Sequence, residues 1–264
     1  MTAFYFGAGA GFFYVLGVLF QGLDLRGKEQ NHKYRVWGLC IGAVLLHSVW
    51  LYRQVFIAEG VHLGLYNIFS LISWQVVILV LLGSVYAQLE NLLILAAPVA
   101  VLSIVLAMLP NEAYQPRQLI DTGIALHILV SILAYSVLSL AAVQALLLAF
   151  QNRQLKQRHL GGVISTLPPI EKMESLLFVM IWMGVVLLSG AIISGYLYLD
   201  DMFAQHVVHK TVLTLISWVV FMILLWGRHQ LGWRGVVAIR WTWVGFSILM
   251  VAFLGSKLVV EIVL

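Results

Sequence analysis

The chain has 264 residues, of which 62% are apolar and only 10% are charged. A soluble domain carries roughly 25% charged and 45–50% apolar residues, so this composition excludes a soluble globular protein and predicts an integral membrane protein. The formal net charge of +4 is no sign of nucleic-acid binding, because basic residues in membrane proteins mark the cytoplasmic connections.

Several segments are long and apolar enough to cross a bilayer, which takes about 20 residues. In chain order they are 3–20, 36–57, 67–86, 92–109, 123–150, 176–198, 210–227 and 241–260. The sequence therefore predicts an all-α integral membrane protein, a bundle of about eight transmembrane helices that forms one transmembrane domain over residues 1–264. Segments 67–86 and 92–109 are expected to form a tight hairpin. Pro98 inside the second of them is expected to kink the helix rather than end it.

Most Lys and Arg residues lie in three connections, those after the first, fifth and seventh segments. Connections rich in Lys and Arg stay in the cytoplasm. With an even number of spans, both termini are then expected on the outer side, which is the periplasmic side if the membrane is a bacterial inner membrane.

Cys40 is the only cysteine and lies inside an apolar run. It excludes disulfides within the chain and any site that needs two thiolates, and we expect a buried structural thiol. The chain has no nucleotide-binding loop, no metalloprotease helix and no catalytic triad that can be assembled, so we expect it not to be an enzyme.

Three histidines lie within or at the mouth of a span, where ionisable residues suggest function. His47 is near the middle of its segment, and His209 is at an outer mouth. His127 lies roughly 5–8 Å below the outer boundary at about 1.5 Å of rise per residue. If segments 123–150 and 210–227 are neighbours, the imidazoles of His127 and His209 suit the two axial positions of haem iron. Alternatively, each histidine bonds a neighbouring Ser, Asn or carbonyl group and is structural.

Two cations lie near these histidines in the sequence. Arg53 is at the outer end of the segment that holds His47, and Lys210 follows His209. Either one is suited to receive a carboxylate such as a haem propionate, and the forked guanidinium of arginine is the better partner. His206 is expected at the surface.

Polar residues also follow one face of the third segment. Asn67, Ser70 and Ser73 are spaced so that they share this face, and they either contact a ligand or bond a neighbouring helix. Asp121, just before the fifth segment, is expected to cap its first turn.

Two stretches carry a resemblance to a known family. The first is LHILVSILAYSVLSLAA over residues 126–142, and the second is HKTVLTLISW over residues 209–218, followed by WGRHQLGWRG over residues 226–235. Together they resemble the cytochrome c assembly membrane proteins of the CcsA, CcmC and HemX type, which handle haem at the outer face of the membrane. The resemblance implies the bacterial inner membrane as the location, and the bilayer, haem b and another membrane protein as partners.

The resemblance also implies a set of site residues. His127 matches the histidine that precedes the external haem platform of the family, whereas the tryptophan-rich external haem motif is absent from the chain. The implied function is therefore to bind or handle haem b, with His127 and His209 as iron ligands. His47 is a further candidate, and Arg53 and Lys210 are implied contacts of the cofactor.

Two other classes of function remain open at this point. One is a structural or regulatory subunit of a membrane complex that contains no haem. The other is a small transporter that moves protons or anions through His47 and Arg53. Absorption near the Soret band separates the haem interpretation from both alternatives.

Overall fold

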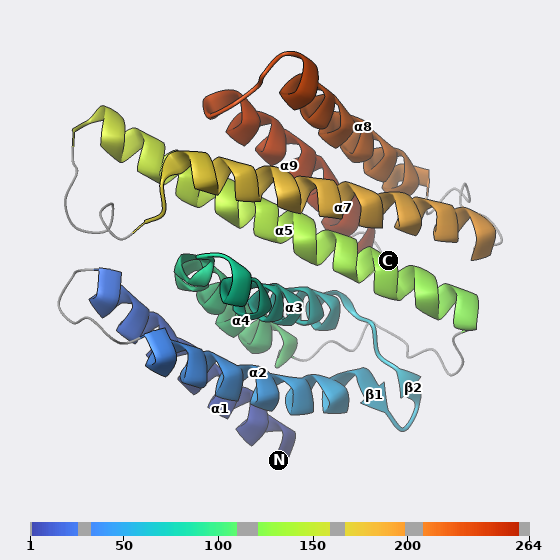
Figure 1. Ribbon diagram of the computed structural model, residues 1–264. Coiled ribbons are helices and arrows are strands. Elements are labelled where there is room, and N and C mark those ends of the chain that lie inside the picture. The colour runs from blue at the N-terminus through green and yellow to red at the C-terminus, as the bar shows by residue number, and fades with distance from the viewer. Residues whose placement is uncertain (1, 26–32, 110–120, 159–166, 199–207, 259–264) are drawn as a thin grey trace. The chain divides into compact units, whose positions relative to one another are not determined.

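The computed structural model describes residues 2–25, 33–109, 121–158, 167–198 and 208–258. They form two compact units (Figure 1), unit 1 with Met1–Leu119 and Arg153–Pro168, and unit 2 with Ile120–Asn152 and Pro169–Leu264. The prediction of a single transmembrane domain stays a prediction.

Unit 1 is built from four helices that pack as neighbours, α1 against α2 and α4, and α3 against α2 and α4. The helices are α1 (Thr2–Leu25), α2 (Lys33–Val55), α3 (Leu65–Tyr86) and α4 (Leu93–Ala107), with the short 3₁₀ helix η1 (Glu90–Leu92) before α4. A small hairpin joins α2 to α3, in which β1 (Phe56–Ile57) pairs antiparallel with β2 (Gly60–Val61). The tight turn between α3 and α4 confirms the predicted helical hairpin.

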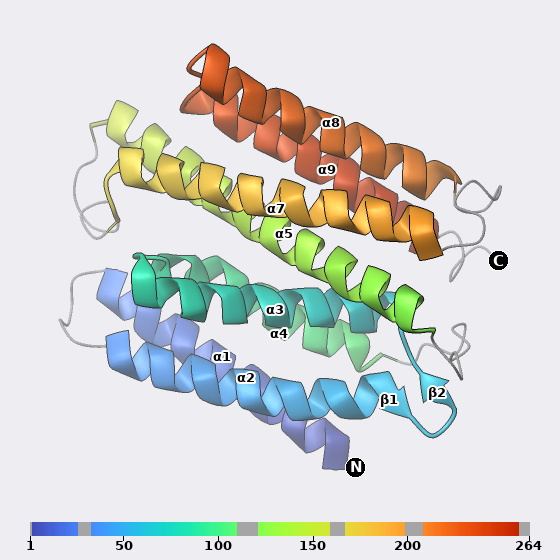
Figure 2. The ribbon, with the colours of Figure 1, turned by 45° about the vertical axis from the view of Figure 1, so that its right-hand side comes forward.

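Unit 2 is also helical, with α8 and α9 lying side by side and α7 packed against α8. Its helices are α5 (Thr122–Lys156), α7 (Ile170–Tyr198), α8 (Val208–Gln230) and α9 (Val236–Leu258). Figure 2 shows α5 running along α7, and hydrogen bonds between the two helices confirm this contact.

All eight of these long helices are apolar enough to span a membrane, as the sequence predicts. Inside a bilayer the backbone polar groups have no water to bond, so these apolar runs form helices that satisfy them internally. Large apolar side chains point away from the core, such as Phe12 at 61% exposure and Trp182 at 56%. Lipid chains are the natural cover for these surfaces.

The predicted start of two helices is wrong. Helix α9 begins at Val236 rather than at residue 241. The turn before it ends at Gly235, whose φ of +53° lies outside the right-handed helical region, so the helix begins at the next residue. Helix α7 begins at Ile170, directly after two prolines, rather than at residue 176. Glu171 and Arg240, which the expected segment bounds leave in the connections, therefore lie within the first two turns of these helices.

Other local predictions are confirmed. Cys40 is a buried free thiol. The carboxylate of Asp121 accepts a hydrogen bond of 2.9 Å from the backbone N–H of Gly123, which caps the first turn of α5. Pro98 lies inside α4 and does not end it, as expected, while the expected kink stays a prediction.

Gly227 of α8 permits a close approach of the Trp233 ring, so we expect Gly227→Ala to destabilise the protein. An added Cβ would overlap the ring, and such overpacking costs about 1–3 kcal/mol. Gly38 of α2 is the matched control, since a Cβ there meets nothing within 4 Å and alanine raises helix propensity by up to about 1 kcal/mol. Thermal unfolding in detergent measures both variants, and an unfolding temperature of Gly227→Ala equal to that of Gly38→Ala would contradict the packing.

The orientation of the termini remains a prediction and can be tested by thiol labelling of intact cells. Glu59 lies exposed between β1 and β2, and Gln157 lies exposed at the far end of α5. We expect Glu59→Cys to react with a membrane-impermeant maleimide and Gln157→Cys to react only after the cells are opened. Buried Cys40 gives little background in the parent protein. The reverse labelling pattern would place both termini in the cytoplasm.

Candidate functional site

His127 lies in the second turn of α5 and is hydrogen-bonded to α7. Its Nδ1 is 3.0 Å from the carbonyl oxygen of Ala191 and 3.2 Å from the hydroxyl oxygen of Ser194. A carbonyl oxygen only accepts hydrogen bonds, so Nδ1 carries the proton and donates it. The other ring nitrogen, Nε2, therefore holds a lone pair, and it makes no hydrogen bond within the described part of the chain.

Small residues of α5 and α7 allow this contact. Gly123, one turn before His127, lies directly against the ring of Tyr198 near the end of α7. The Ser194 hydroxyl also donates to the Ala191 carbonyl, at 3.1 Å. Sequence reasoning missed this contact between Ser194 and His127. No signal in the sequence pairs two residues on separate helices that are 67 positions apart.

The first turns of α8 also approach this part of α5. Lys210 is close enough to His127 to interact with it electrostatically, and Thr214 interacts with the side chain of Tyr135. His209 is exposed on α8, and among the described residues no hydrogen bond joins it to His127. The first turns of α8 therefore lie near α5, which is the condition for the haem interpretation, while the pairing of His127 with His209 stays a prediction.

His47 has a different environment, inside unit 1. It is fully buried, with Nδ1 at 3.3 Å from the Tyr14 hydroxyl and Nε2 at 2.9 Å from the Ser70 hydroxyl. The ring of Trp50 lies 5.7 Å from the imidazole. Both ring nitrogens are thus engaged, and the side chain ties α1, α2 and α3 together.

The polar face of α3 also bonds neighbouring helices. Ser70 and Ser73 lie 3.4 Å and 2.6 Å from the hydroxyl of Ser103 on α4. Asn67 donates to the backbone carbonyl of Gln54 on α2, at 3.4 Å. Of the two interpretations that the sequence left open, helix contact accounts for the two serines.

Arg53 is exposed at the end of α2, with its guanidinium 5.5 Å above the ring of Phe6. It belongs to unit 1 and His127 to unit 2, so its role as a propionate contact stays a prediction. His32, His159 and His206 lie outside the described residues. Within the described ranges no three His, Cys, Asp or Glu side chains gather as ligands for a metal ion.

Comparison with known proteins agrees with this architecture. The family model described as "Cytochrome C assembly protein" matches residues 37–264. The inner membrane protein YpjD of Escherichia coli (strain K12) is 31% identical over 206 residues, which are 78% of each chain. Protein HemX of Brevibacillus brevis is 22% identical over 256 residues, 92% of each chain. No solved structure gives a significant match.

The family match covers six of the eight spans in full and all of the span in α2 except its first residues. It supports a role related to cytochrome c biogenesis, and the eight apolar helices place the protein in a lipid bilayer. The chain therefore belongs to the cytochrome c assembly protein family and is a multi-pass inner membrane protein.

Proposed function

We propose that the protein binds haem b near the outer end of unit 2 and handles it, without catalysis, in cytochrome c biogenesis. His127 is one ligand of the haem iron, through Nε2, and His209 is the second. Lys210 is the contact for a propionate. When bound, haem supplies a redox-active iron centre.

The observation that carries the proposal is the hydrogen bond between His127 Nδ1 and the Ala191 carbonyl oxygen. Histidines that ligate metals usually donate their other ring N–H to a carbonyl or carboxylate, which fixes the ring and the tautomer. His127 already has this arrangement, and its Nε2 is left with the lone pair that iron requires. The donor set of this residue therefore fits a haem.

The location of Lys210 also supports a haem site at His127. A propionate needs a cation at the edge of the haem, and an ammonium group binds carboxylate as a point charge. Lys210 is within electrostatic range of His127, and its neighbour His209 is exposed rather than committed to the core. His47 is left out of the proposed ligand set, because Tyr14 and Ser70 occupy both of its nitrogens.

The relatives are consistent with handling of haem, since the family is described as a cytochrome c assembly family. The tryptophan-rich external motif is absent from the chain. We therefore assign the protein to the binding or relay of haem rather than to its attachment to an apocytochrome.

We expect Ser194→Ala to weaken haem binding by about tenfold. This is the low end of the roughly 10–100-fold that is lost when a residue bonded to a metal ligand is removed. The hydroxyl of Ser194 accepts from His127 Nδ1 and donates to the Ala191 carbonyl, while that carbonyl remains in the variant. Titration of purified protein with haemin, followed at the Soret band, measures the affinity.

Thr242→Val is the matched control, because it removes a fully buried hydroxyl whose one hydrogen bond to a described residue goes to the Ala238 carbonyl of its own helix. Its haem affinity is expected to equal that of the parent. If Ser194→Ala and Thr242→Val bind haemin alike, the hydrogen bonds to α7 do not position the ligand.

A further inference from the structure

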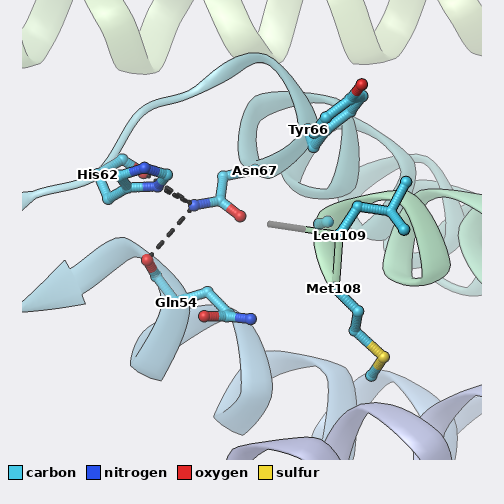
Figure 3. A pocket seen from close by; sticks show the side chains of 7 residues that line it. Gln54, His62, Tyr66, Asn67, Met108 and Leu109 are labelled. Atoms are coloured by element: carbon cyan, nitrogen blue, oxygen red, sulfur yellow. Dashed lines mark hydrogen bonds between the residues drawn. The ribbon is translucent and has the colours of Figure 1, made fainter. Parts of the chain in front are cut away.

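Unit 1 contains a cavity of its own, where α2 ends, α3 begins and α4 ends. Its volume is about 250 Å³, about eight times the volume that one water molecule takes in the liquid. The lining residues are Gln54, His62, Tyr66, Asn67, Ala107, Met108 and Leu109. Figure 3 shows Asn67 and Leu109 on facing sides of it.

The side-chain amide of Asn67 has a fixed orientation. Its nitrogen donates to the backbone carbonyl oxygens of Gln54, at 3.4 Å, and of His62, at 3.2 Å, and it also contacts His62 Nδ1 at 2.5 Å. Two of these three partners are carbonyl oxygens, which only accept, so the amide cannot be flipped. The residue is 5% exposed, which leaves it little freedom to move.

This orientation presents the amide oxygen of Asn67 to the cavity. In Figure 3 the oxygen points away from Gln54 and His62, toward the side where Leu109 lies. It has no hydrogen-bond partner among the residues that the structure describes, and neither does the side-chain amide of Gln54. The cavity therefore offers one fixed acceptor and one adjustable amide.

The rest of the lining restricts the charge of a ligand. None of the lining residues is a carboxylate, a lysine or an arginine. The lining thus holds no permanently charged side chain, which favours a neutral ligand over an ion at the edge of a bilayer. Ala107, Met108 and Leu109 provide an apolar side, and Met108 and Tyr66 suit contact with an aromatic ring.

We propose that this cavity is a binding site for a small neutral phenol, whose hydroxyl donates to Asn67 Oδ1 and whose ring lies against Met108 and Leu109. Gln54 serves as a second hydrogen-bonding partner of the ligand. The site is in unit 1 and is independent of haem binding at His127. Free phenols and the head groups of membrane hydroquinones share this chemistry.

The test compares two probes of the same shape, p-cresol and p-xylene, which differ in a hydroxyl against a methyl group. The methyl group of Met108 reports binding by NMR in nanodiscs of isotope-labelled protein, and Met222, exposed on α8, reports mere partition of the probe into lipid. We expect p-cresol to shift Met108 saturably at about two- to tenfold lower concentration than p-xylene, as one net hydrogen bond implies. The proposal would be overturned if both probes saturated the Met108 shift at the same concentration, or if Met108 shifted no more than Met222.

Two variants complete the test. Asn67→Leu is expected to abolish the preference for p-cresol, and Leu109→Trp is expected to abolish binding by filling the cavity. Leu109 is 50% exposed, so its variant should fold even where Asn67→Leu does not, and unchanged binding to it would overturn the site. A short-tailed hydroquinone that shifts Met108 at a lower concentration than p-cresol does identifies a membrane ligand. If p-cresol acts at the lower concentration, the ligand is a free phenol, and either result supports the site.

Discussion

His127→Ala is expected to remove haem from the protein while leaving its fold intact. The variant loses the only nitrogen of this residue that is available to iron, and His127 is only partly buried, so little packing is lost. Removal of an iron ligand should cost more than the roughly 10–100-fold that loss of an outer-shell partner costs. Soret absorbance per mole of purified protein measures the effect, and it should fall to the level of an unrelated membrane protein.

The matched control is His229→Ala, which changes an exposed histidine at the C-terminal end of α8 and should keep its haem. His209→Ala separates the two proposed ligands. If His209 is the second ligand, the remaining haem loses its six-coordinate low-spin spectrum and changes to a five-coordinate one. Full haem occupancy in a His127→Ala, His209→Ala double variant would rule out this ligand pair.

His47→Ala is expected to have the opposite profile, a large loss of stability with no specific loss of haem. The substitution leaves a cavity in the fully buried centre of unit 1 and removes the partner of both Tyr14 and Ser70. Truncation of a large buried side chain costs about 2–5 kcal/mol, and each interhelical hydrogen bond in a membrane adds about 0.6 kcal/mol. Thermal unfolding in detergent measures the loss, and haem is counted per mole of folded protein.

Tyr14→Phe is the control for this prediction, since it keeps the ring and removes only the hydroxyl that contacts His47. It should cost about 0.6 kcal/mol, the value of a single hydrogen bond between membrane helices. A His47→Ala variant that unfolds at the temperature of the parent but has lost its haem would make His47 a ligand rather than a structural residue.

The transmembrane fold follows from composition because lipid imposes a strong constraint. Each apolar run of sufficient length has to form a helix, and all eight expected spans are present. Hydropathy is less informative about the ends of helices. Charged residues such as Glu171 and Arg240 are tolerated in the first two turns of a helix near the membrane surface, so the predicted starts of α7 and α9 are too late.

The environment of each histidine was harder to predict. Depth in the membrane singles out His47 and His127 as candidates, but it does not show which of them has a ring nitrogen available to a ligand. The difference arises from which helices face each other: two hydroxyls from α1 and α3 engage His47, whereas one edge of His127 meets α7. A single sequence holds no record of such contacts, and neither Tyr14 nor Ser194 differs locally from an ordinary packing residue.

The central claim is that the protein binds haem, and an absorption spectrum of the wild-type protein tests it most directly. Protein is purified in mild detergent from haem-replete cells and haem is counted by the pyridine haemochrome assay. We predict about one haem b per chain, the stoichiometry of a single bis-histidine site. The spectrum should show a Soret band and, on reduction, resolved α and β bands. A colourless protein that also fails to bind added haemin would contradict the account and favour a structural subunit of a membrane complex.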